Sequence, residues 1–255
     1  MTKITAIIPT LNEEERIKNS LKSAEFADEV IVIDSFSSDS TVEIVKQSGA
    51  TLLQRKFDDF SSQKNFAIDQ ASNDWIVWID ADEILTIELQ KEIREVIENA
   101  NQLVGFYVYR KFFFKGKRMR YTGTQNDRLI RVFNRKYCRY EGKVHEKIKT
   151  DGKLGVLQNK ILHYSYISFD RYIMKLNHYS ALKAEELYEK GVMVTPYHII
   201  IKPIIRFIKH YIVKLGFLDG FHGFIISFIL SYGVLVRYIK LWNLKQEHKK
   251  NDSTG

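Results

Sequence analysis

The chain has 255 residues, of which 45% are hydrophobic, so it is long enough for one large domain or for a domain with an appendage. A single cysteine, Cys138, excludes an internal disulfide framework and a cysteine-rich metal site. The net charge of +8 is uneven, because residues 196–250 carry nine Lys and Arg against two acids, which suits nucleic acid or an anionic membrane. No secretory signal pattern opens the sequence, and we expect a reducing, cytoplasmic location.

The N-terminal half alternates short apolar runs with amphipathic stretches. Pro9 is expected to end the first strand, acidic residues 13–15 to begin the first helix, and Gly49 to close the second helix. This alternation predicts an α/β fold with a mainly parallel sheet covered by helices on both faces. The predicted strands are 3–8, 29–34, 50–54 and 74–79, and the predicted helices are 12–26, 39–48, 60–71 and 86–100.

The pattern changes beyond residue 104. Aromatic and β-branched runs predict further strands at 105–114, 128–133 and 143–149. The chain beyond residue 168 is predicted to be helical. The sequence shows no internal repeat and no low-complexity linker.

The most informative motif is Asp80-Ala81-Asp82, which follows the predicted strand at 74–79. A strand that ends in two carboxylates delivers both to the carboxyl edge of a parallel sheet, where ligands bind. Two carboxylates without a basic neighbour in the sequence favour a cation, and hard oxygen ligands suit Mg²⁺ or Mn²⁺ bound together with substrate phosphates. In the competing interpretation, Asp82 is the N-cap of a helix that starts near Thr86.

The other strands also end in polar loops. Residues 9–14 follow the first strand and residues 34–41 the second, so with residues 80–83 they would converge on one crevice. Their carboxylates and hydroxyls suit ribose and base groups, while a metal would meet a diphosphate. The sequence lacks the glycine-rich loops of dinucleotide-binding proteins and NTPases, which weakens those assignments. Taken singly, each loop could equally be ordinary turn and cap chemistry.

These loops resemble a known family. Residues 7–13 (Ile-Ile-Pro-Thr-Leu-Asn-Glu), 32–41 and 80–83 are similar to motifs of the family 2 glycosyltransferases, which have the GT-A fold. One departure is Phe36, where such sequences commonly carry glycine. A closer resemblance, to the small lipopolysaccharide-core β-glucosyltransferases, is carried by residues 63–65, 128–133, 144–146 and 217–223.

The resemblance implies a nucleotide-sugar site and a metal site. Asp82 would hold Mg²⁺ or Mn²⁺, with Asp80 acting through water and His163 as a further ligand. From the residues alone, His163 could equally be a core side chain, and Arg128, or more readily Arg131, a solvated surface cation rather than a phosphate ligand. A UDP-sugar would be bound by Pro9, Thr10, Asn12, Glu14, Asp34, Ser35, Gln63, Lys64, Asp80, Ala81, Arg128 and Arg131.

The resemblance also implies a reaction that inverts the anomeric centre. An acceptor hydroxyl must lose its proton as it attacks the anomeric carbon, and one positioned carboxylate can accept it. We predict that Glu146 is this base, because it lies in the matching triplet at 144–146, and Asp127 is the competitor. In the structural alternative, Glu146 is a surface residue paired with Lys143 or Lys147.

The C-terminal region predicts attachment to a membrane. Residues 220–236 form an uncharged, apolar stretch of 17 residues, at the short limit for a spanning helix. Residues 197–217 interleave isoleucine with Lys and Arg, which is typical of a helix that lies in an anionic lipid interface. We expect peripheral attachment rather than a span, and an oligomer interface or a buried helix pair is the alternative.

These features lead to an expected organisation and function. The resemblance implies a GT-A catalytic domain at 1–165, with a nucleotide-sugar half at 1–100 and an acceptor half at 101–165, before a helical membrane-association region at 166–250. It implies a bacterial, metal-dependent enzyme at the inner face of the plasma membrane that moves a hexose, glucose from UDP-glucose, to a lipid-anchored saccharide such as lipopolysaccharide core. The alternatives are a polyprenyl phosphate or a capsule or exopolysaccharide chain as acceptor, or a non-catalytic binder of sugar nucleotides or nucleic acid. No nucleic-acid-binding motif appears, so we expect no nucleic acid partner.

Overall fold

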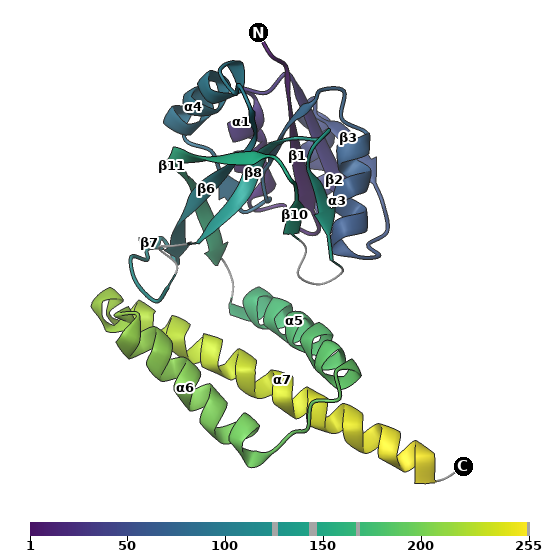
Figure 1. Cartoon of the computed structure of the whole chain (residues 1–255), viewed down its shortest axis with the longest axis vertical. Coiled ribbons are helices and arrows are strands. Elements are labelled where there is room, and N and C mark those ends of the chain that lie inside the picture. The colour runs from purple at the N-terminus through teal and green to yellow at the C-terminus, as the bar shows by residue number, and fades with distance from the viewer. Residues whose placement is uncertain (124–126, 143–146, 167–168, 254–255) are drawn as a thin grey trace. The chain divides into compact units, whose positions relative to one another are not determined.

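The apolar runs of the N-terminal half form strands and the stretches between them form helices, as the alternation predicted (Figure 1). The computed structural model describes residues 1–123, 127–142, 147–166 and 169–253. Contacts divide the chain into two units, one joining residues 1–112 to 126–165 and the other joining 113–125 to 166–255. The second unit therefore includes a short segment from the middle of the chain.

The first unit is an α/β structure built on one large sheet. Its helices are α1 (Ile17–Ala24), α2 (Thr41–Gln47), α3 (Phe60–Asp69) and α4 (Ile87–Glu98). Its strands are β1 (Ile4–Thr10), β2 (Glu29–Asp34), β3 (Thr51–Gln54), β4 (Trp75–Trp78), β5 (Glu83–Ile84), β6 (Leu103–Phe114), β8 (Arg128–Asn134), β9 (Arg139–Glu141), β10 (Lys147–Lys149) and β11 (Lys153–Tyr166). The last residues of β6 and β11 belong to the second unit.

The order of the strands explains where ligands can bind. The sheet runs β3-β2-β1-β4-β8-β6-β11-β5, and β9 pairs with β10 beside it. The first four strands are parallel, as predicted, whereas β8 is antiparallel to both β4 and β6, and β11 is antiparallel to β5. The carboxyl ends of β1, β2 and β4 therefore meet at one edge.

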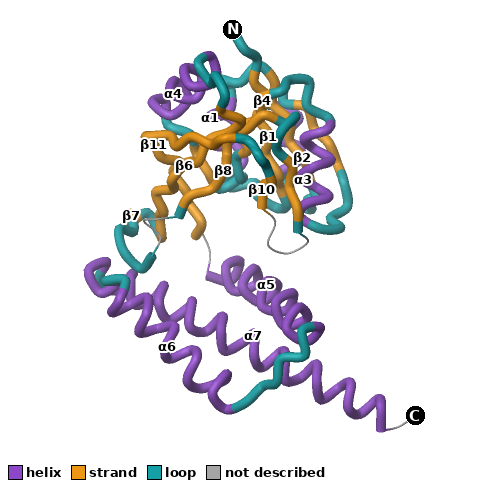
Figure 2. Tube along the Cα trace, viewed as in Figure 1, coloured by secondary structure: helices purple, strands orange, loops and turns teal. Residues whose placement is uncertain are grey.

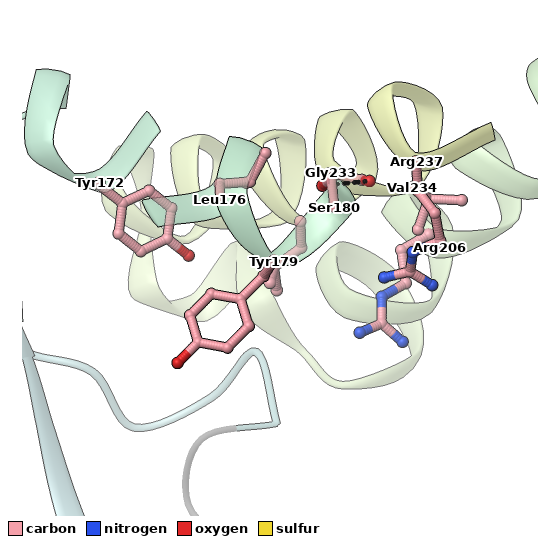
Figure 3. Close-up of a pocket in the computed structure, with 9 residues that line it drawn as sticks. Tyr172, Leu176, Tyr179, Ser180, Arg206, Gly233, Val234 and Arg237 are labelled. Atoms are coloured by element: carbon pink, nitrogen blue, oxygen red, sulfur yellow. Dashed lines mark hydrogen bonds between the residues drawn. The ribbon is translucent and has the colours of Figure 1, made fainter. Parts of the chain in front are cut away.

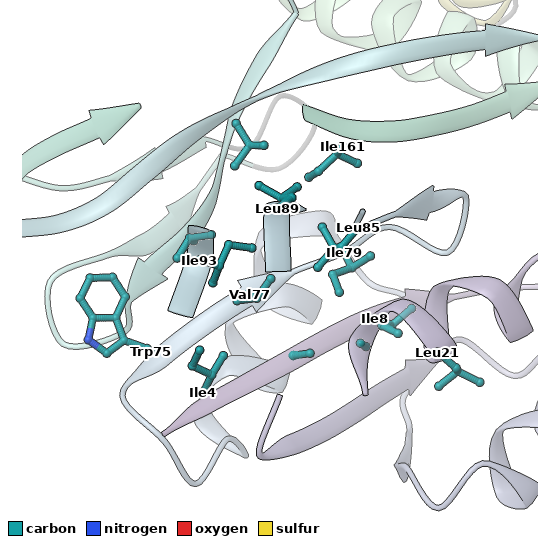
Figure 4. Close-up of a cluster of buried hydrophobic side chains, with 14 of the residues drawn as sticks. Ile4, Ile8, Leu21, Trp75, Val77, Ile79, Leu85, Leu89, Ile93 and Ile161 are labelled. Atoms are coloured by element: carbon teal, nitrogen blue, oxygen red, sulfur yellow. The ribbon is translucent and has the colours of Figure 1, made fainter. Parts of the chain in front are cut away.

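Side chains of the central strands alternate between two apolar cores. Ile4 and Ile8 of β1 face the core covered by α1 and α4, whereas Ile7 faces the core covered by α3. The same alternation separates Val77 from Trp78 in β4. Figure 4 shows the first core, where side chains of β1, β4, α1 and α4 meet and β11 contributes another. The sheet is thus covered on both faces, as predicted.

One predicted strand end is wrong. Pro9 lies inside β1, opposite Ile33 of β2, and the strand continues to Thr10. The pairing of β1 with β4 ends at Ile7, so no partner strand faces the position where the proline lacks its N–H group. Proline therefore breaks no hydrogen bond of the sheet at this place.

The predicted start of the first helix is also wrong. The helix α1 begins at Ile17, and no acidic residue stands in its first turn. Asn12 has a φ of 55°, in the left-handed region, which cannot continue into a right-handed helix. The N–H groups of Glu13 and Glu14 donate to side chains of the loop after β2 instead.

The interpretation of Asp82 as a helix cap is wrong. The helix α4 has Thr86 as its N-cap, and the Thr86 hydroxyl accepts from the Leu89 N–H at 3.3 Å. Asp82 is buried and lies among other side chains of the carboxyl edge. Its carboxylate is therefore left for another role.

The second unit is mostly helical (Figure 2). Both α5 and α6 pack against α7, and Ala184, Tyr238 and Leu241 form a small apolar cluster with their neighbours. The elements are the short strand β7 (Lys117–Arg118), α5 (Phe169–Glu189), the π-helical turns η1 (Tyr197–Ile201) and η2 (Lys209–Val213), α6 (Lys202–Ile208), the 3-10 turn η3 (Gly216–Asp219) and α7 (Phe221–Ser253).

Apolar side chains of this unit remain exposed. Within the described part of the chain, one segment, Phe221–His248, is long and apolar enough to cross a membrane, by length and composition alone. A helix of this kind is consistent with membrane association. The exposed large apolar residues of α6, α7 and their neighbouring turns include Ile200, Ile201, Ile204, Ile205, Ile208, Ile212, Phe221, Phe224 and Phe228.

Candidate active site

The loops after β1 and β2 interlock at the carboxyl edge of the sheet. The Asn12 N–H donates to Ser37 Oγ at 2.8 Å, and Asn12 Oδ1 accepts from the Ser38 N–H at 2.7 Å. Phe36 is 57% exposed and has a φ of 63°, in the left-handed region that favours glycine. The loop thus keeps the backbone conformation that glycine would favour, although its side chain is bulky.

Glu14 and Thr10 occupy different positions in this loop pair. Glu14 Oε2 accepts from the Ser40 N–H at 2.9 Å, and the Glu14 N–H donates to Asp39 Oδ2 at 3.2 Å, so the Glu14 carboxylate joins the two loops. Thr10 is 5% exposed at the end of β1, next to Pro9. Within the described residues its buried Oγ1 has no hydrogen-bond partner, which leaves a polar atom for a ligand.

Asp34 is fully buried at the end of β2. Its carboxylate accepts from the Ser37 hydroxyl at 2.5 Å, the Ser37 N–H at 3.0 Å and Gln54 Nε2 at 3.1 Å. All three groups donate, so the Asp34 carboxylate acts as the acceptor in each of these bonds. The adjacent Ser35 accepts from Gln63 Nε2 of α3 at 2.5 Å, which connects this loop to the helix.

Lys64 follows Gln63 on α3. Its ammonium group lies 4.5 Å from the centre of the Tyr140 ring and 5.1 Å from that of Trp78. An ammonium over an aromatic face is attracted by the negative charge of the ring face. Lys64 is thus positioned beside the end of β4, where the carboxylate motif begins.

Asp80 is held by Arg131 of β8. Both terminal nitrogens of Arg131 donate to the Asp80 carboxylate, and Nη2 also donates to Glu83 Oε1 at 2.7 Å. The Trp78 indole N–H donates to Asp80 Oδ1 at 3.2 Å. Asp80 therefore has a basic neighbour in the fold that its sequence neighbourhood does not contain.

Arg128 and Arg131 could both have been solvated surface cations, but only Arg128 lies at the surface. Arg131 is 3% exposed, so the expectation that it is the more solvated of the two is wrong. Arg128, three residues earlier on β8, is exposed and stacks over the Tyr107 ring at 4.7 Å. Arg131 faces inward because its strand alternates in the usual way and buried carboxylates meet it there.

The charges of Asp80, Glu83 and Arg131 shift one another's pKa values. Burial alone would raise the pKa of Asp80, but the positive charges of Arg131 and Lys64 outweigh it and hold that pKa well below its usual range. Burial raises the pKa of Glu83, and although Arg131 opposes this, the negative charge of Asp80 adds to it. Burial would lower the pKa of Arg131, but Asp80 and Glu83 raise it well above its ordinary value. Asp80 and Arg131 therefore form an ion pair.

Asp82 and His163 converge from distant segments. Asp82 Oδ2 lies 3.4 Å from His163 Nε2 and 3.5 Å from Arg16 Nη1. The pairing of β11 with β5 sets His163 opposite Glu83 and so brings its ring to this edge. His163 is largely buried, and its ring also meets Phe112 edge to face. The histidine is thus both packed against an aromatic ring and directed at Asp82.

The donor atoms of Asp82 and His163 fit a metal ion that also binds substrate. Among the residues that the structure describes, no group of three or more His, Cys, Asp or Glu side chains is arranged to hold a metal. Mg²⁺ commonly takes one or two carboxylates and completes its coordination with substrate phosphates and water. The pair of Asp82 and His163 meets that smaller requirement.

Of the two candidate bases, only Asp127 lies among the residues that the structure describes. Asp127 Oδ2 accepts from Arg110 Nε at 2.9 Å and from Arg110 Nη2, and Arg110 Nη1 donates to Glu83 Oε1 at 3.3 Å. Arg110 therefore links Asp127 to the segment that carries Asp80 and Asp82. Glu146 lies outside the described residues, as does the rest of its triplet at 144–146.

The backbone of the carboxylate motif is fixed by α1. The buried Ser20 hydroxyl lies 2.7 Å from the Ala81 carbonyl oxygen and 2.9 Å from that of Glu83, and donates to both. Ala81 is buried, and its small side chain lies in the apolar core that α1 covers.

Sequence reasoning assigned no role to Glu83 or Arg16, and it considered Arg110 only as part of a stretch, 110–121, that could flank the acceptor or form an exposed hairpin. Glu83 directly follows Asp82 and is fully buried, so its position beside the motif is a signal that could have found it. The two arginines carry no such signal, because they come from the loop before α1 and from β6 and meet the carboxylates only in the folded sheet.

Comparison with known proteins identifies the family of this site. The sequence model described as Glycosyl transferase family 2 matches residues 5–170. An uncharacterized glycosyltransferase of Rickettsia typhi is 31% identical, over 96% of this chain and 88% of its own length. The lipopolysaccharide core biosynthesis glycosyltransferase LpsC of Rhizobium meliloti is 29% identical, over 92% of this chain and 93% of its own length. Among solved structures, S. aureus TarS is similar at 16% identity with a TM-score of 0.48, over 86% of this chain and 46% of that one.

The family match spans the strands whose ends carry Asp34, Asp80 and Asp82, and it extends through His163. The relatives match nearly the whole chain, including its helical C-terminal region. The chain therefore belongs to glycosyl transferase family 2, with a GT-A-like α/β fold and glycosyl transfer as its activity.

Proposed function

We propose that the protein is a metal-dependent, inverting hexosyltransferase that moves glucose from UDP-glucose to a lipid-linked saccharide of the lipopolysaccharide-core type. The observation that carries the proposal is the convergence of Asp82 and His163, 3.4 Å apart, at the sheet edge where β2 ends in buried Asp34. LpsC, a relative in lipopolysaccharide core biosynthesis, supports the class of acceptor.

The nucleoside of the donor would bind between the loops after β1 and β2. The Asp34 carboxylate accepts hydrogen bonds, so it suits the N–H of a uracil or the hydroxyls of a ribose. The Thr10 hydroxyl, buried beside it without a hydrogen-bond partner among the described residues, supplies a second polar contact. Asn12, Glu14 and Ser35 hold these loops in place through the bonds described above.

The diphosphate would lie beside the carboxylate motif. Asp82 and His163 would hold Mg²⁺ or Mn²⁺, which supplies positive charge against the departing diphosphate. The ion pair with Arg131 engages Asp80, so Asp80 acts through water or by fixing the motif rather than as a direct ligand. Lys64 and Arg128 add positive charge for the phosphates.

The acceptor hydroxyl would attack the anomeric carbon from the face opposite the diphosphate. Its oxygen forms the new glycosidic bond, its proton passes to a carboxylate, and the nucleoside diphosphate leaves with the electrons of the old bond. Glu146 is the proposed base. Asp127 is the weaker candidate, because Arg110 already donates twice to Asp127 Oδ2, so this oxygen is engaged within the protein.

Calorimetric titration of the purified full chain tests the donor site. UDP, other nucleoside diphosphates and UDP-sugars are titrated with and without Mn²⁺. We expect UDP binding that requires Mn²⁺ and is lost in Asp82→Ala, with Asp69→Ala as a control because Asp69 is an exposed partner of Arg139. Equal UDP binding with and without Mn²⁺ would contradict the metal assignment, and no binding of any nucleotide would overturn the donor site.

Turnover separates the two bases. Glu146→Gln keeps the size of the side chain and removes its basicity, so it should abolish transfer while UDP still binds. Transfer that survives in Glu146→Gln but fails in Asp127→Asn would move the assignment to Asp127. The control is the binding titration, which reports whether the donor site of each variant is intact.

The acceptor and the location belong to the same proposal. A lipid-linked acceptor suits a cytoplasmic enzyme attached peripherally to the inner face of the plasma membrane through its exposed apolar and basic helices. A polyprenyl phosphate or a capsule or exopolysaccharide chain is the alternative acceptor. Transfer assays with a labelled sugar donor separate the lipopolysaccharide-core acceptor from a polyprenyl phosphate, because only the true acceptor should become labelled.

A further inference from the structure

The second unit contains a cavity among its own helices. Its volume is about 330 Å³, and side chains of α5, α6 and α7 line it (Figure 3). Apolar and aromatic residues form most of the wall, with two arginines at one end. The lining residues are Tyr172, Leu176, Tyr179, Ser180, Arg206, Leu230, Gly233, Val234 and Arg237.

The two arginines face one another, and no described residue of the cavity wall supplies a counter-charge. Arg206 comes from α6 and Arg237 from α7, and Figure 3 shows their guanidinium groups side by side. No carboxylate is among the lining residues that the structure describes. Within the described part of the chain, neither guanidinium makes an ion pair or a hydrogen bond, and the Nε atom of each is buried without a partner.

This arrangement is unfavourable unless an anion is present. Burial and the positive charge of Arg237 both lower the pKa of Arg206, so the protein disfavours the very charge that the residue carries. Guanidinium groups stay ionised in proteins, and two of them in a partly buried place repel each other. A ligand with two negative charges would relieve the repulsion and satisfy the buried N–H groups.

The surroundings indicate what carries the anion. A guanidinium fork matches the oxygens of a phosphate, and a phosphate monoester has close to two charges near neutral pH. The rest of the cavity wall is apolar or aromatic, as in Leu176, Leu230 and Val234. The same helices expose isoleucine and phenylalanine side chains, such as Ile205 and Phe228. Both features suit an amphiphile with a phosphate head and an apolar body.

We propose that Arg206 and Arg237 form a binding site for the phosphate monoester group of a membrane lipid, in the cavity that α5, α6 and α7 line. The proposal rests on the membrane attachment put forward above but not on the transfer reaction. The second unit would then bind one kind of lipid headgroup selectively, in addition to attracting anionic lipids in general through its basic surface.

Vesicle flotation with the purified full chain tests this site. The vesicles are phosphatidylcholine alone, or with phosphatidic acid, or with enough phosphatidylglycerol to match its charge. The wild type should prefer phosphatidic acid, and Arg206→Gln with Arg237→Gln should weaken that binding about tenfold or more while sparing phosphatidylglycerol. The matched control is Lys209→Gln with Lys245→Gln, which removes the same charge from the same helical region outside the cavity.

The outcomes separate a built site from general attraction. Equal losses in both double variants, on both anionic lipids, would overturn the site and leave only surface charge. If the wild type binds no anionic vesicle at all, both the attachment and the lipid site fail. Inorganic phosphate should compete for phosphatidic acid but not for phosphatidylglycerol; phosphate that binds calorimetrically without any preference among vesicles would overturn the lipid assignment.

The melting temperature of each variant shows whether a loss of binding comes from a loss of folding. The guanidinium groups have no protein partner among the described residues, so Arg206→Gln with Arg237→Gln should not lower the melting temperature. Arg206→Lys with Arg237→Lys keeps both charges but loses the fork, and it should retain part of the preference. Full retention of the preference in the Gln pair, with normal melting, would contradict the proposal. UDP binding, measured in the same samples, reports separately on the donor site.

Discussion

A single buried arginine holds two carboxylates of the segment 80–83. Arg131 reaches Asp80 and Glu83 together, and Arg110 reaches Glu83 and Asp127. The result is a chain of alternating charges that runs from β6 through the carboxylate motif to β8. Because each member is held by the next, removing one leaves a buried charge without compensation.

Arg131→Met should therefore be strongly destabilising. It leaves fully buried Glu83 with less compensation, and such losses cost about 3–5 kcal/mol of unfolding free energy. Arg128→Met, on the same strand, removes an exposed cation and should change that free energy by about 0.5 kcal/mol or less. Urea unfolding followed by tryptophan fluorescence measures both. Equal effects of the two substitutions would contradict the inward position of Arg131.

The residues of the site could be predicted to different degrees. Asp34, Asp80 and Asp82 stand at strand ends, and a parallel sheet brings strand ends together whatever the details. His163 was predicted from resemblance, and its approach to Asp82 depends on the register of β11 with β5, which no local pattern encodes. The partners of the carboxylates depend on the same long-range pairing, so Arg131 could not be recognised as buried.

At the scale of elements, the segment 217–223 is a structural joint of the second unit. Asp219, at the end of η3, is 3% exposed and accepts from the Arg120 N–H at 3.1 Å and the Tyr121 N–H at 2.9 Å. A Cβ atom on Gly223 would lie 1.8 Å from the Gly216 carbonyl oxygen, so glycine is required there. The turn and the loop after β7 are thus held together by short contacts.

Asp219→Ala should loosen this joint. Two backbone N–H groups lose their acceptor, and leaving buried donors unsatisfied costs about 1–3 kcal/mol. The control is Asp170→Ala, which removes an exposed carboxylate from α5. Hydrogen exchange of the Arg120 and Tyr121 amides reports the change directly. Unchanged protection of these amides in Asp219→Ala would show that the joint does not depend on the carboxylate.

The elements themselves were predicted best where apolar runs are short and regular. β2 has the predicted bounds, and β3, β4 and β6 lie within two residues of theirs, because alternation and turn residues mark them locally. β11 was not predicted, although it has 14 residues. Gly155 and the polar run 158–160 interrupt its pattern, and it is a strand because the sheet supplies partners on both sides.

At the scale of the whole molecule, the two units divide the proposed tasks. The residues assigned to the donor, the metal and the described candidate base all lie within 1–112 and 126–165. The exposed isoleucines of α6 and its neighbouring turns, the candidate span and the arginine cavity all lie in the second unit. Donor binding and membrane binding should therefore be separable by protein engineering.

A chain that ends at Ser165 and replaces residues 113–125 by an Asn-Gly turn tests this separation. β6 and β8 are antiparallel neighbours with Tyr109 opposite Arg128, so a short turn can reconnect them. We expect this chain to fold cooperatively and bind UDP with Mn²⁺ as the full chain does, because every described donor-site residue is retained. It should no longer float with anionic vesicles, since it lacks α6 and α7. Vesicle binding equal to that of the full chain would assign attachment to the first unit, and a folded chain without UDP binding would show that the donor site needs the second.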